Sequence, residues 1–262
     1  MSEQGIIYFV GAGPGAADLI TVRGARLLRE ADLVVYAGSL VDRELVQAYA
    51  PQAQVYDSAG MALTEIITAM LDGVTAGKRV VRLHTGDPSI YGAIQEQMAA
   101  LDRLGVGYQV VPGVTSAFAA AAALKQELTL PEVSQTVIIT RVEGRTPVPE
   151  REALRSLATH GATLALYLSV GMIDAVVAEL LAGGAYTPAT PVAVVSKASW
   201  TDEQIVTGCL GNIAARIAAA DITKQAMILV GEVLGVRQAG VQAASKLYDE
   251  TFSHGCRNGL VA

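Results

Sequence analysis

The first apolar run of the chain, Ile6–Val10, leads directly into a glycine-rich turn, Gly11-Ala12-Gly13-Pro14-Gly15, and a helical pattern follows from Leu19. An apolar run of this length is typical of a buried strand. Glycine permits the tight turn and lets the backbone approach a ligand closely, and the amides at the start of the helix can point at that ligand. The turn therefore predicts an α/β fold with a small-molecule site beside its first strand.

The first half of the chain continues this alternation of strand-like and helix-like segments. We expect strands at 5–10, Leu33–Tyr36, Gln54–Tyr56, Arg79–Leu83 and Tyr108–Val111. We expect helices near 19–30, 41–49, 62–77 and 91–104. Strands and helices repeated in this order predict a mostly parallel sheet.

A second α/β set follows the segment Val111-Pro112-Gly113-Val114 and the alanine-rich helix that begins at Ser116. Its expected strands are Thr136–Arg141, Thr163–Leu168, Pro191–Val195, Gln204–Thr207 and Ala226–Val230, with helices near 150–159, 172–182 and 211–219. We therefore expect two α/β domains with mostly parallel or mixed sheets and a cleft between them. The expected bounds are 1–113 and 114–236, followed by a polar tail, 237–262, that packs locally or frays.

The amino-acid composition agrees with this fold, and the net charge argues against nucleic acid as a partner. The 262 residues are 52% hydrophobic but only 5% aromatic, as expected for parallel strands that are buried on both faces and rich in aliphatic residues. The net charge of −6 argues against a nucleic-acid surface, although local arginines could still bind an anionic small molecule.

The cysteines and the apolar stretches predict where the protein is located and whether it binds a metal. Cys209 and Cys256 form neither a disulfide framework nor a metal-ligand spacing, so we expect free thiols in the cytoplasm and no metal. The start of the chain lacks a signal-peptide pattern, and the most apolar stretch, 117–124, is too short to span a bilayer. We expect a soluble protein without a membrane partner.

Three loops are expected to converge at one edge of the first sheet. The glycine-rich turn, Tyr36-Ala37-Gly38-Ser39 and His84-Thr85-Gly86-Asp87-Pro88 each follow a predicted strand. Ligands of parallel sheets bind beyond the carboxyl ends of the strands. These loops therefore form the predicted binding site.

A dinucleotide is one candidate ligand, because residues 11–16 formally fit the G-x-G-x-x-[G/A] fingerprint. That fingerprint also needs an acid at the end of the second strand, where residues 36–39 have none. Asp32 precedes that strand and so lies at its opposite end, and Pro14 lacks an amide for a pyrophosphate. No Gly-Lys-Ser/Thr follows the turn, which excludes a P-loop. These features disfavour a nucleotide-dependent oxidoreductase.

Three motifs, Gly-Ala-Gly-Pro-Gly at 11–15, Gly-Asp-Pro-Ser-Ile-Tyr-Gly at 86–92 and Val-Pro-Gly-Val-Thr-Ser at 111–116, occur in this order. With them the chain resembles the tetrapyrrole methylase family over about residues 5–235. The stretches 36–41, 84–88, 140–150 and 224–229 strengthen the resemblance to the precorrin methylases, Glu-Gly-Arg-Thr-Pro at 143–147 above all.

The resemblance implies an S-adenosylmethionine-dependent methyltransferase of corrin biosynthesis that methylates C11 of precorrin-4 or its cobalt counterpart. A sister methylase acting at another ring position is the alternative, and a sensor that binds the same ligand without turnover is a non-enzymatic one. Family members usually form homodimers, which a high apolar fraction allows.

The resemblance also implies cofactor-binding residues, carried over position by position. They are Pro14, Thr85, Gly86, Asp87, Ile90, Thr115, Ser116, Leu168 and Ala198, with Ala226 and Met227 in a strand that contacts the cofactor through its backbone. Some relatives carry an acid just after the second-strand tyrosine, where this chain has Ala37. No catalytic acid can therefore be assigned there.

The implied substrate carries several carboxylates, so its site needs arginine or lysine. Arg141 and Arg145, at the end of a second-domain strand, are the first candidates, and His84 is a third substrate-binding candidate. Weaker candidates are Arg82, Lys197 and Arg43. The base that removes a proton after methylation stays open among Glu143, His84, Tyr91 and water, so the catalytic residue is unknown.

Overall fold

The computed structural model describes residues 5–236, 240 and 245–258 and divides the chain into two compact units. The first comprises Met1–Ala119 together with Lys197–Asp202, and the second comprises Ala120–Ser196 and Glu203–Ala262. The division falls later than the boundary expected at residue 113. It also assigns to the first unit a short segment from the far half of the sequence, a long-range association that no local pattern could predict.

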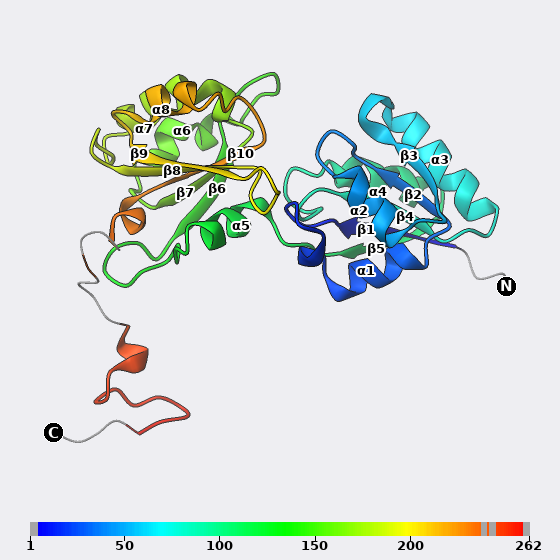
Figure 1. Cartoon of the computed structure of the whole chain (residues 1–262), viewed down its shortest axis with the longest axis horizontal. Helices are drawn as coiled ribbons and strands as arrows, with labels where there is room; N and C mark the ends of the chain where they lie inside the picture. Colours follow the sequence, from blue (N-terminus) through cyan, green and yellow to red (C-terminus); the bar gives the residue numbers. More distant parts are fainter. Residues whose placement is uncertain (1–4, 237–239, 241–244, 259–262) are drawn as a thin grey trace. The chain divides into compact units, whose positions relative to one another are not determined.

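The first unit contains a five-stranded parallel sheet (Figure 1). Its strands are β1 (Ile6–Gly11), β2 (Leu33–Tyr36), β3 (Gln54–Asp57), β4 (Val80–His84) and β5 (Gly107–Val111). Their order is β3-β2-β4-β1-β5, and all four neighbouring pairs are parallel. The expected strands and the parallel sheet are confirmed, with small shifts at the strand ends.

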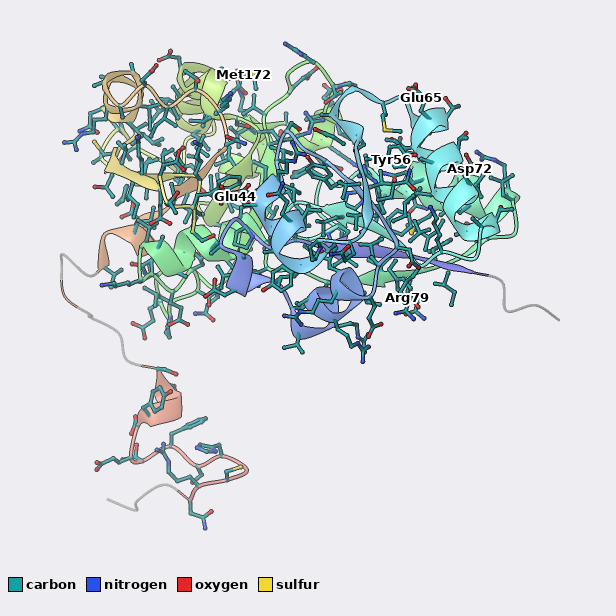
Figure 2. All side chains as sticks on the ribbon, turned by 45° about the vertical axis from the view of Figure 1, so that its right-hand side comes forward. Glu44, Tyr56, Glu65, Asp72, Arg79 and Met172 are labelled. Atoms are coloured by element: carbon teal, nitrogen blue, oxygen red, sulfur yellow. The ribbon has the colours of Figure 1, made fainter. Side chains whose placement is uncertain are left out.

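Helices cover both faces of this sheet. They are α1 (Val22–Arg29), α2 (Arg43–Tyr49), α3 (Leu63–Thr75) and α4 (Ile94–Arg103), with 3-10 turns at Ala17–Leu19 and Ser58–Gly60. The helices α1 and α2 pack on one face, and α3 and α4 on the other. Their polar sides stay in solvent, as Glu44 on α2 and Glu65 and Asp72 on α3 show (Figure 2).

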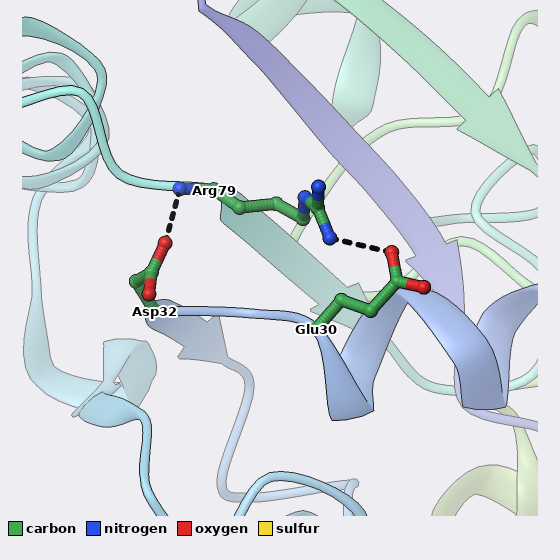
Figure 3. Close-up of polar contacts among 3 residues, drawn as sticks. All are labelled: Glu30, Asp32 and Arg79. Carbon is green, nitrogen blue, oxygen red and sulfur yellow. Dashed lines mark hydrogen bonds and ion pairs between the residues drawn. The ribbon is translucent and has the colours of Figure 1, made fainter.

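The amino ends of the strands lie at the edge opposite the predicted site. There the Asp32 carboxylate accepts a hydrogen bond of 2.8 Å from the backbone amide of Arg79 (Figure 3). The Arg79 guanidinium forms an ion pair with Glu30 on the same edge, and both side chains are exposed enough that the pair contributes about 1 kcal/mol at most. Asp32 thus joins strand ends away from the site, as its position before β2 predicted.

The second unit contains a mixed sheet in the order β6-β7-β10-β8-β9. Its strands are β6 (Val137–Arg141), β7 (Thr163–Tyr167), β8 (Pro191–Ser196), β9 (Gln204–Cys209) and β10 (Ala226–Val230). Only the β6–β7 pair is parallel, while the other three are antiparallel. The expected strands are confirmed, and the fold class with them.

One face of this second sheet is covered by helices α6 (Leu154–Ala158), α7 (Ile173–Ala182) and α8 (Ile213–Ala219). The remaining elements are α5 (Ser116–Ala123), which spans the division point, and 3-10 turns at Glu150–Glu152, Val170–Met172, Glu232–Leu234 and Lys246–Tyr248. The helix expected at 150–159 is a 3-10 turn followed by the short α6, because Ala153 between them has an extended ψ of 138°.

The expected tail at 237–262 lies partly outside the described residues. Its described part contains the turn at Lys246–Tyr248 and a backbone bridge between His254 and Arg257. Across the part of the chain that the structure describes, no helix has the length and apolar character needed to cross a membrane.

Candidate functional site

The candidate site lies at the carboxyl edge of the first sheet, where the loops after β1, β4 and β5 are neighbours because these strands are neighbours. The loops after β1 and β4 are directly bonded to each other. Ala12 N donates to His84 O at 2.7 Å, and Gly13 and Gly86 exchange two backbone hydrogen bonds of 3.3 and 2.8 Å. The expected meeting of the glycine-rich turn with residues 84–88 is therefore confirmed, and the third loop that joins them is the one after β5 rather than the expected residues 36–39.

Glycine is required where the three loops meet. A Cβ atom on Gly11 would lie 2.6 Å from both Gly113 Cα and Gly86 O, and one on Gly113 would lie 2.1 Å from Gly86 O. The backbones of the three loops therefore touch with no room for side chains. The edge of the sheet is therefore a close-packed frame of backbone and small residues, in which Gly11 and Gly86 are buried and Gly113 is partly buried.

Asp87 joins the β4 loop to the β5 loop. Its Oδ1 accepts a hydrogen bond from Ser89 N at 2.8 Å, and its Oδ2 accepts one from Gly113 N at 2.9 Å. It does not cap the next helix, which begins only at Ile94. Each carboxylate oxygen keeps capacity for a further hydrogen bond, so Asp87 can both fix the loops and bind a ligand hydroxyl.

The rest of the β4 loop, residues 88–93, is tightly wound. A Cβ atom on Gly92 would lie 2.2 Å from Pro88 O, and Tyr91 and Ala93 have positive φ values of 53° and 49°. Such conformations are held only where the surroundings determine them and are common at ligand sites. The loop leaves Tyr91 exposed beside the edge of the sheet.

The segment Lys197–Asp202 holds the glycine-rich turn. Trp200 Nε1 donates a hydrogen bond of 2.9 Å to Pro14 O, and Ala16 N donates one of 3.0 Å to Ser199 Oγ. This places the predicted cofactor residue Ala198 in the same unit as Pro14. Sequence reasoning missed Ser199 and Trp200, for which the one available signal was that the chain has a single tryptophan.

An acid that the sequence analysis overlooked lies next to the β2 loop. Asp57, the last residue of β3, pairs in register with Tyr36, and its Oδ1 accepts hydrogen bonds from Gly38 N at 3.0 Å and Ala59 N at 2.9 Å. The strand β2 itself ends without an acid, as predicted. Asp57 could not be recognised before the sheet order was known.

His84 is buried rather than exposed to a ligand. Its side chain is 4% exposed and stacks on Phe9 at a centroid distance of 5.9 Å. Burial, aided by the nearby Arg82 charge, lowers the pKa of His84 to about 3. The predicted substrate contact through this imidazole finds no support in the geometry, and the backbone carbonyl of His84 serves the site instead by accepting from Ala12 N.

Arg82 is also buried and bonds to neutral groups. Its Nε donates to Gln97 Oε1 at 3.0 Å, and its Nη1 donates to Val35 O at 3.2 Å. Desolvation lowers the pKa of Arg82 to about 10. Gln97 Nε2 in turn donates to Ala93 O at 3.0 Å, so this buried group supports the start of α4 and the end of the β4 loop.

The two arginines predicted to bind substrate differ in the structure. Arg141 turns its guanidinium onto its own loop and donates to Thr146 O at 3.1 Å and to Pro147 O at 2.7 Å. Arg145 is exposed on that loop, and among the described residues no hydrogen bond or ion pair is found for it. Arg141 therefore shapes the loop, while Arg145 is available to a ligand.

The remaining predicted residues of the second unit lie at strand ends. Leu168 falls just outside β7 with a φ of 55° and is 66% exposed, so the expected strand end at Leu168 is corrected to Tyr167. Ala226 and Met227 pair with β8, but the ladder with β7 begins only at Ile228. One side of their backbone thus lies beyond the ladder, as a strand that binds through its backbone requires.

The described residues contain no group of three or more histidine, cysteine, aspartate or glutamate side chains placed to hold a metal ion. Cys209 is half-buried, Cys256 is exposed, and both are free thiols.

Comparison with known proteins agrees with the motifs. Residues 6–214 match the family model of the tetrapyrrole (corrin/porphyrin) methylases. A cobalt-precorrin-4 C(11)-methyltransferase of Methanocaldococcus jannaschii is 55% identical over 254 residues, which are 97% of this chain and 96% of that protein.

Solved structures give the same result. An X-ray structure of a cobalamin biosynthetic enzyme, a cobalt-precorrin-4 methyltransferase, matches with a TM-score of 0.85 at 52% identity and covers 87% of this chain and 95% of its own. A uroporphyrin-III C-methyltransferase from Thermus thermophilus, complexed with S-adenosylhomocysteine, matches with a TM-score of 0.74 at 33% identity, over 88% of this chain and 100% of its own.

The buried His84 predicts a specific sensitivity to acid. Its pKa is lower in the folded protein than in the unfolded chain, so the unfolded chain binds the extra proton and stability is lost as the pH falls below about 6.5. Between pH 7 and pH 5 this group should remove about 2 kcal/mol from the free energy of unfolding. The His84→Gln variant should lack this part of the decline in urea unfolding curves measured at both pH values.

The matched control is His160→Gln, at an exposed position. It should retain the wild-type pH dependence. A His84→Gln variant whose stability declines as steeply as that of the wild type would contradict the assignment.

Proposed function

Since this chain belongs to the tetrapyrrole methylase family, we propose that it transfers a methyl group from S-adenosylmethionine to C11 of precorrin-4 or cobalt-precorrin-4 in corrin (cobalamin) biosynthesis. The observation in the structure that supports this proposal is the backbone contact among Gly11, Gly86 and Gly113, which brings the three family motifs together at one edge of the first sheet. A sister methylase acting at another ring position is the alternative.

The residues at this edge fit the cofactor. Close backbone packing joins the three loops, and Asp87 offers a carboxylate that these loops already orient. When bound, the cofactor supplies a methyl group already activated on a sulfonium. The protein therefore needs orientation more than a nucleophile, and holding both reactants in attack geometry can supply roughly 7–11 kcal/mol.

We assign the cofactor to the loops at the edge of the first sheet. The proposed residues there are Pro14, Thr85, Gly86, Asp87, Ile90, Thr115, Ser116 and Ala198. Their support is the bonding of the β1, β4 and β5 loops and the docking of the Lys197–Asp202 segment on the glycine-rich turn. The assignments of Leu168, Ala226 and Met227 rest on the family resemblance and on their positions at strand ends.

The substrate carboxylates are assigned to Arg145. This guanidinium is exposed on the 142–147 loop, which Arg141 holds in place by bonding to the carbonyls of Thr146 and Pro147. An arginine can grip a carboxylate through two parallel hydrogen bonds and so fix the register of the substrate. The base that takes the proton released after methylation stays open among Glu143, His84, Tyr91 and water; Glu143 and Tyr91 are exposed, and His84 is buried.

We also propose that the enzyme works in the cytoplasm as a homodimer. Two free thiols suit a reducing compartment. The assembly follows from the family resemblance alone, and light scattering on the eluting protein should give twice the chain mass of 27.2 kDa. A monomeric mass at micromolar concentration would refute it.

The proposed function is tested first by isothermal titration with S-adenosylhomocysteine, with NAD as the control ligand. Micromolar affinity for the former and no binding of the latter are expected, because the second strand lacks the acid that a dinucleotide needs. Anaerobic incubation with S-adenosylmethionine and either precorrin-4 or cobalt-precorrin-4 should then yield product methylated at C11. Methylation at another carbon would favour the sister enzyme, and no S-adenosylhomocysteine binding would refute the function.

The role of Arg145 predicts a separation of two affinities. Arg145→Ala should raise KM for the tetrapyrrole about tenfold, the effect of losing one charge-assisted contact of about 1.4 kcal/mol or more. Binding of S-adenosylhomocysteine should be unchanged by calorimetry. Arg151→Ala, which removes another exposed arginine, is the control and should behave as the wild type. An equal loss of both affinities in Arg145→Ala would overturn the assignment.

The glycine contact predicts that Gly113→Ala disturbs the site. The added methyl group would press on Gly86 O, and overpacking of this kind typically costs about 1–3 kcal/mol. We expect a lower melting temperature and at least a tenfold weaker affinity for S-adenosylhomocysteine in calorimetry. Gly107→Ala, at the start of the strand that leads into this loop, is the control, since its Cβ would meet only Ile6 Cγ1 at an ordinary 3.7 Å. Unchanged affinity in Gly113→Ala would contradict the role of the contact.

A further inference from the structure

We propose that Trp200 is a positioning residue for the methyl donor: its indole holds the glycine-rich turn 14–16 in the conformation that binds the cofactor. The proposal rests on the function proposed above and adds a residue that lies outside the three family motifs. Trp200 acts through the turn, so it is distinct from the residues assigned to the cofactor itself.

The contacts of the indole carry the proposal. Its Nε1 donates to Pro14 O at 2.9 Å. A Cβ atom on Gly15 would lie 2.1 Å from the indole Cδ1 and 2.3 Å from Nε1, so the ring lies directly against the Gly15 backbone. The neighbouring Ser199 Oγ accepts from Ala16 N at 3.0 Å. Three successive residues of the turn are therefore each held by the same short segment.

The segment that carries Trp200 is itself held in shape. Trp200 N donates to Lys197 O at 2.9 Å, and the Lys197 ammonium forms an ion pair with the Asp202 carboxylate. Lys197 and Ser199 have positive φ values of 49° and 69°. Backbone conformations of this kind persist only where the surroundings determine them. The ordered segment Lys197–Asp202 thus holds the indole against the glycine-rich turn.

The glycine-rich turn needs such support because its glycines give its backbone high conformational freedom. Glycine loses more conformational freedom on ordering than any other residue, and Gly13 and Gly15 flank a proline that has no amide to donate. A turn that is ordered before the ligand arrives does not have to be ordered by the ligand. Removing the indole should therefore weaken cofactor binding more than it slows the methyl transfer itself.

The same segment carries Ala198, which is buried and which we assign to the cofactor. The ordering of Lys197–Asp202 around Trp200 therefore fixes a predicted cofactor residue together with the turn. Trp200 therefore affects the affinity for the cofactor in two ways, by holding Pro14 and by fixing the position of Ala198.

The chain has one tryptophan, so its fluorescence reports on this position alone. Titrating the wild-type protein with S-adenosylhomocysteine should change the emission, with the same midpoint as the calorimetric isotherm. Trp200→Phe keeps an aromatic ring but lacks the donor to Pro14 O. It should raise KM for S-adenosylmethionine about tenfold while leaving kcat within about twofold at saturation, the fold-change that the loss of one hydrogen bond typically gives.

Two further variants complete the test. Thr201→Ala changes an exposed neighbour and should match the wild type in KM and kcat. Gly15→Ala adds a methyl group where the indole lies, so it should shift the emission maximum of the free protein to longer wavelength and raise KM for S-adenosylmethionine as Trp200→Phe does. The KM for S-adenosylmethionine would not rise in Trp200→Phe if Trp200 only stabilised the fold.

The outcomes separate this proposal from the proposed function. If calorimetry shows that S-adenosylhomocysteine binds the wild type, but the emission is unaffected and Trp200→Phe has a wild-type KM, the positioning role is overturned and the function stands. A Trp200→Phe variant with a lower melting temperature and an unchanged KM would overturn it equally. If S-adenosylhomocysteine fails to bind the wild type in calorimetry, both proposals fall.

Discussion

The meeting of Gly11, Gly86 and Gly113 is the constraint on which the rest of the candidate site depends. Three loops from neighbouring strands approach until backbone touches backbone, closer than any side chain would allow. The Gly13–Gly86 hydrogen bonds and the Asp87 bond to Gly113 N are possible only at that separation. A parallel sheet brings strand ends together, but only glycine lets these loops approach until their backbones touch.

Behind that edge, buried polar groups hold the β4 loop from within the unit. The main chain of His84 bonds to the glycine-rich turn, and its ring packs on Phe9 in the core. Arg82 reaches Gln97, whose amide bonds to Ala93 O at the end of the loop. Burying a guanidinium against neutral partners has a desolvation penalty, seen in the lowered pKa of Arg82. The hydrogen bonds that accompany this burial connect Arg82 through Gln97 to Ala93 and so support the end of the β4 loop.

The two edges of the first sheet show why a sequence can fit the dinucleotide fingerprint without binding a dinucleotide. Gly11, Gly13 and Ala16 fit that pattern because any ligand loop after a first parallel strand needs small residues. Asp32 lies at the amino edge and bonds to Arg79 N, so it cannot serve a ligand at the carboxyl edge. Asp57 does reach the β2 loop, and its Oδ1 already accepts the amides of Gly38 and Ala59. The glycine pattern at 11–16 predicts a ligand loop. Which ligand it fits depends on acidic residues elsewhere in the fold, which the pattern does not contain.

The sequence by itself determined the strands of both units, most of their helices, the parallel sheet of the first unit and the family, because these follow from local periodicity and from motifs that are contiguous in the chain. It also predicted that residues 11–15 and 84–88 meet, but not that the loop after β5, rather than residues 36–39, joins them. Only the tertiary structure decided that the His84 ring is buried, that Arg141 bonds to its own loop while Arg145 stays exposed, and that Trp200 holds the glycine-rich turn. Burial, the direction of a side chain and contact between distant segments depend on how the elements pack, and residues far apart in the chain carry no local signal of their contact.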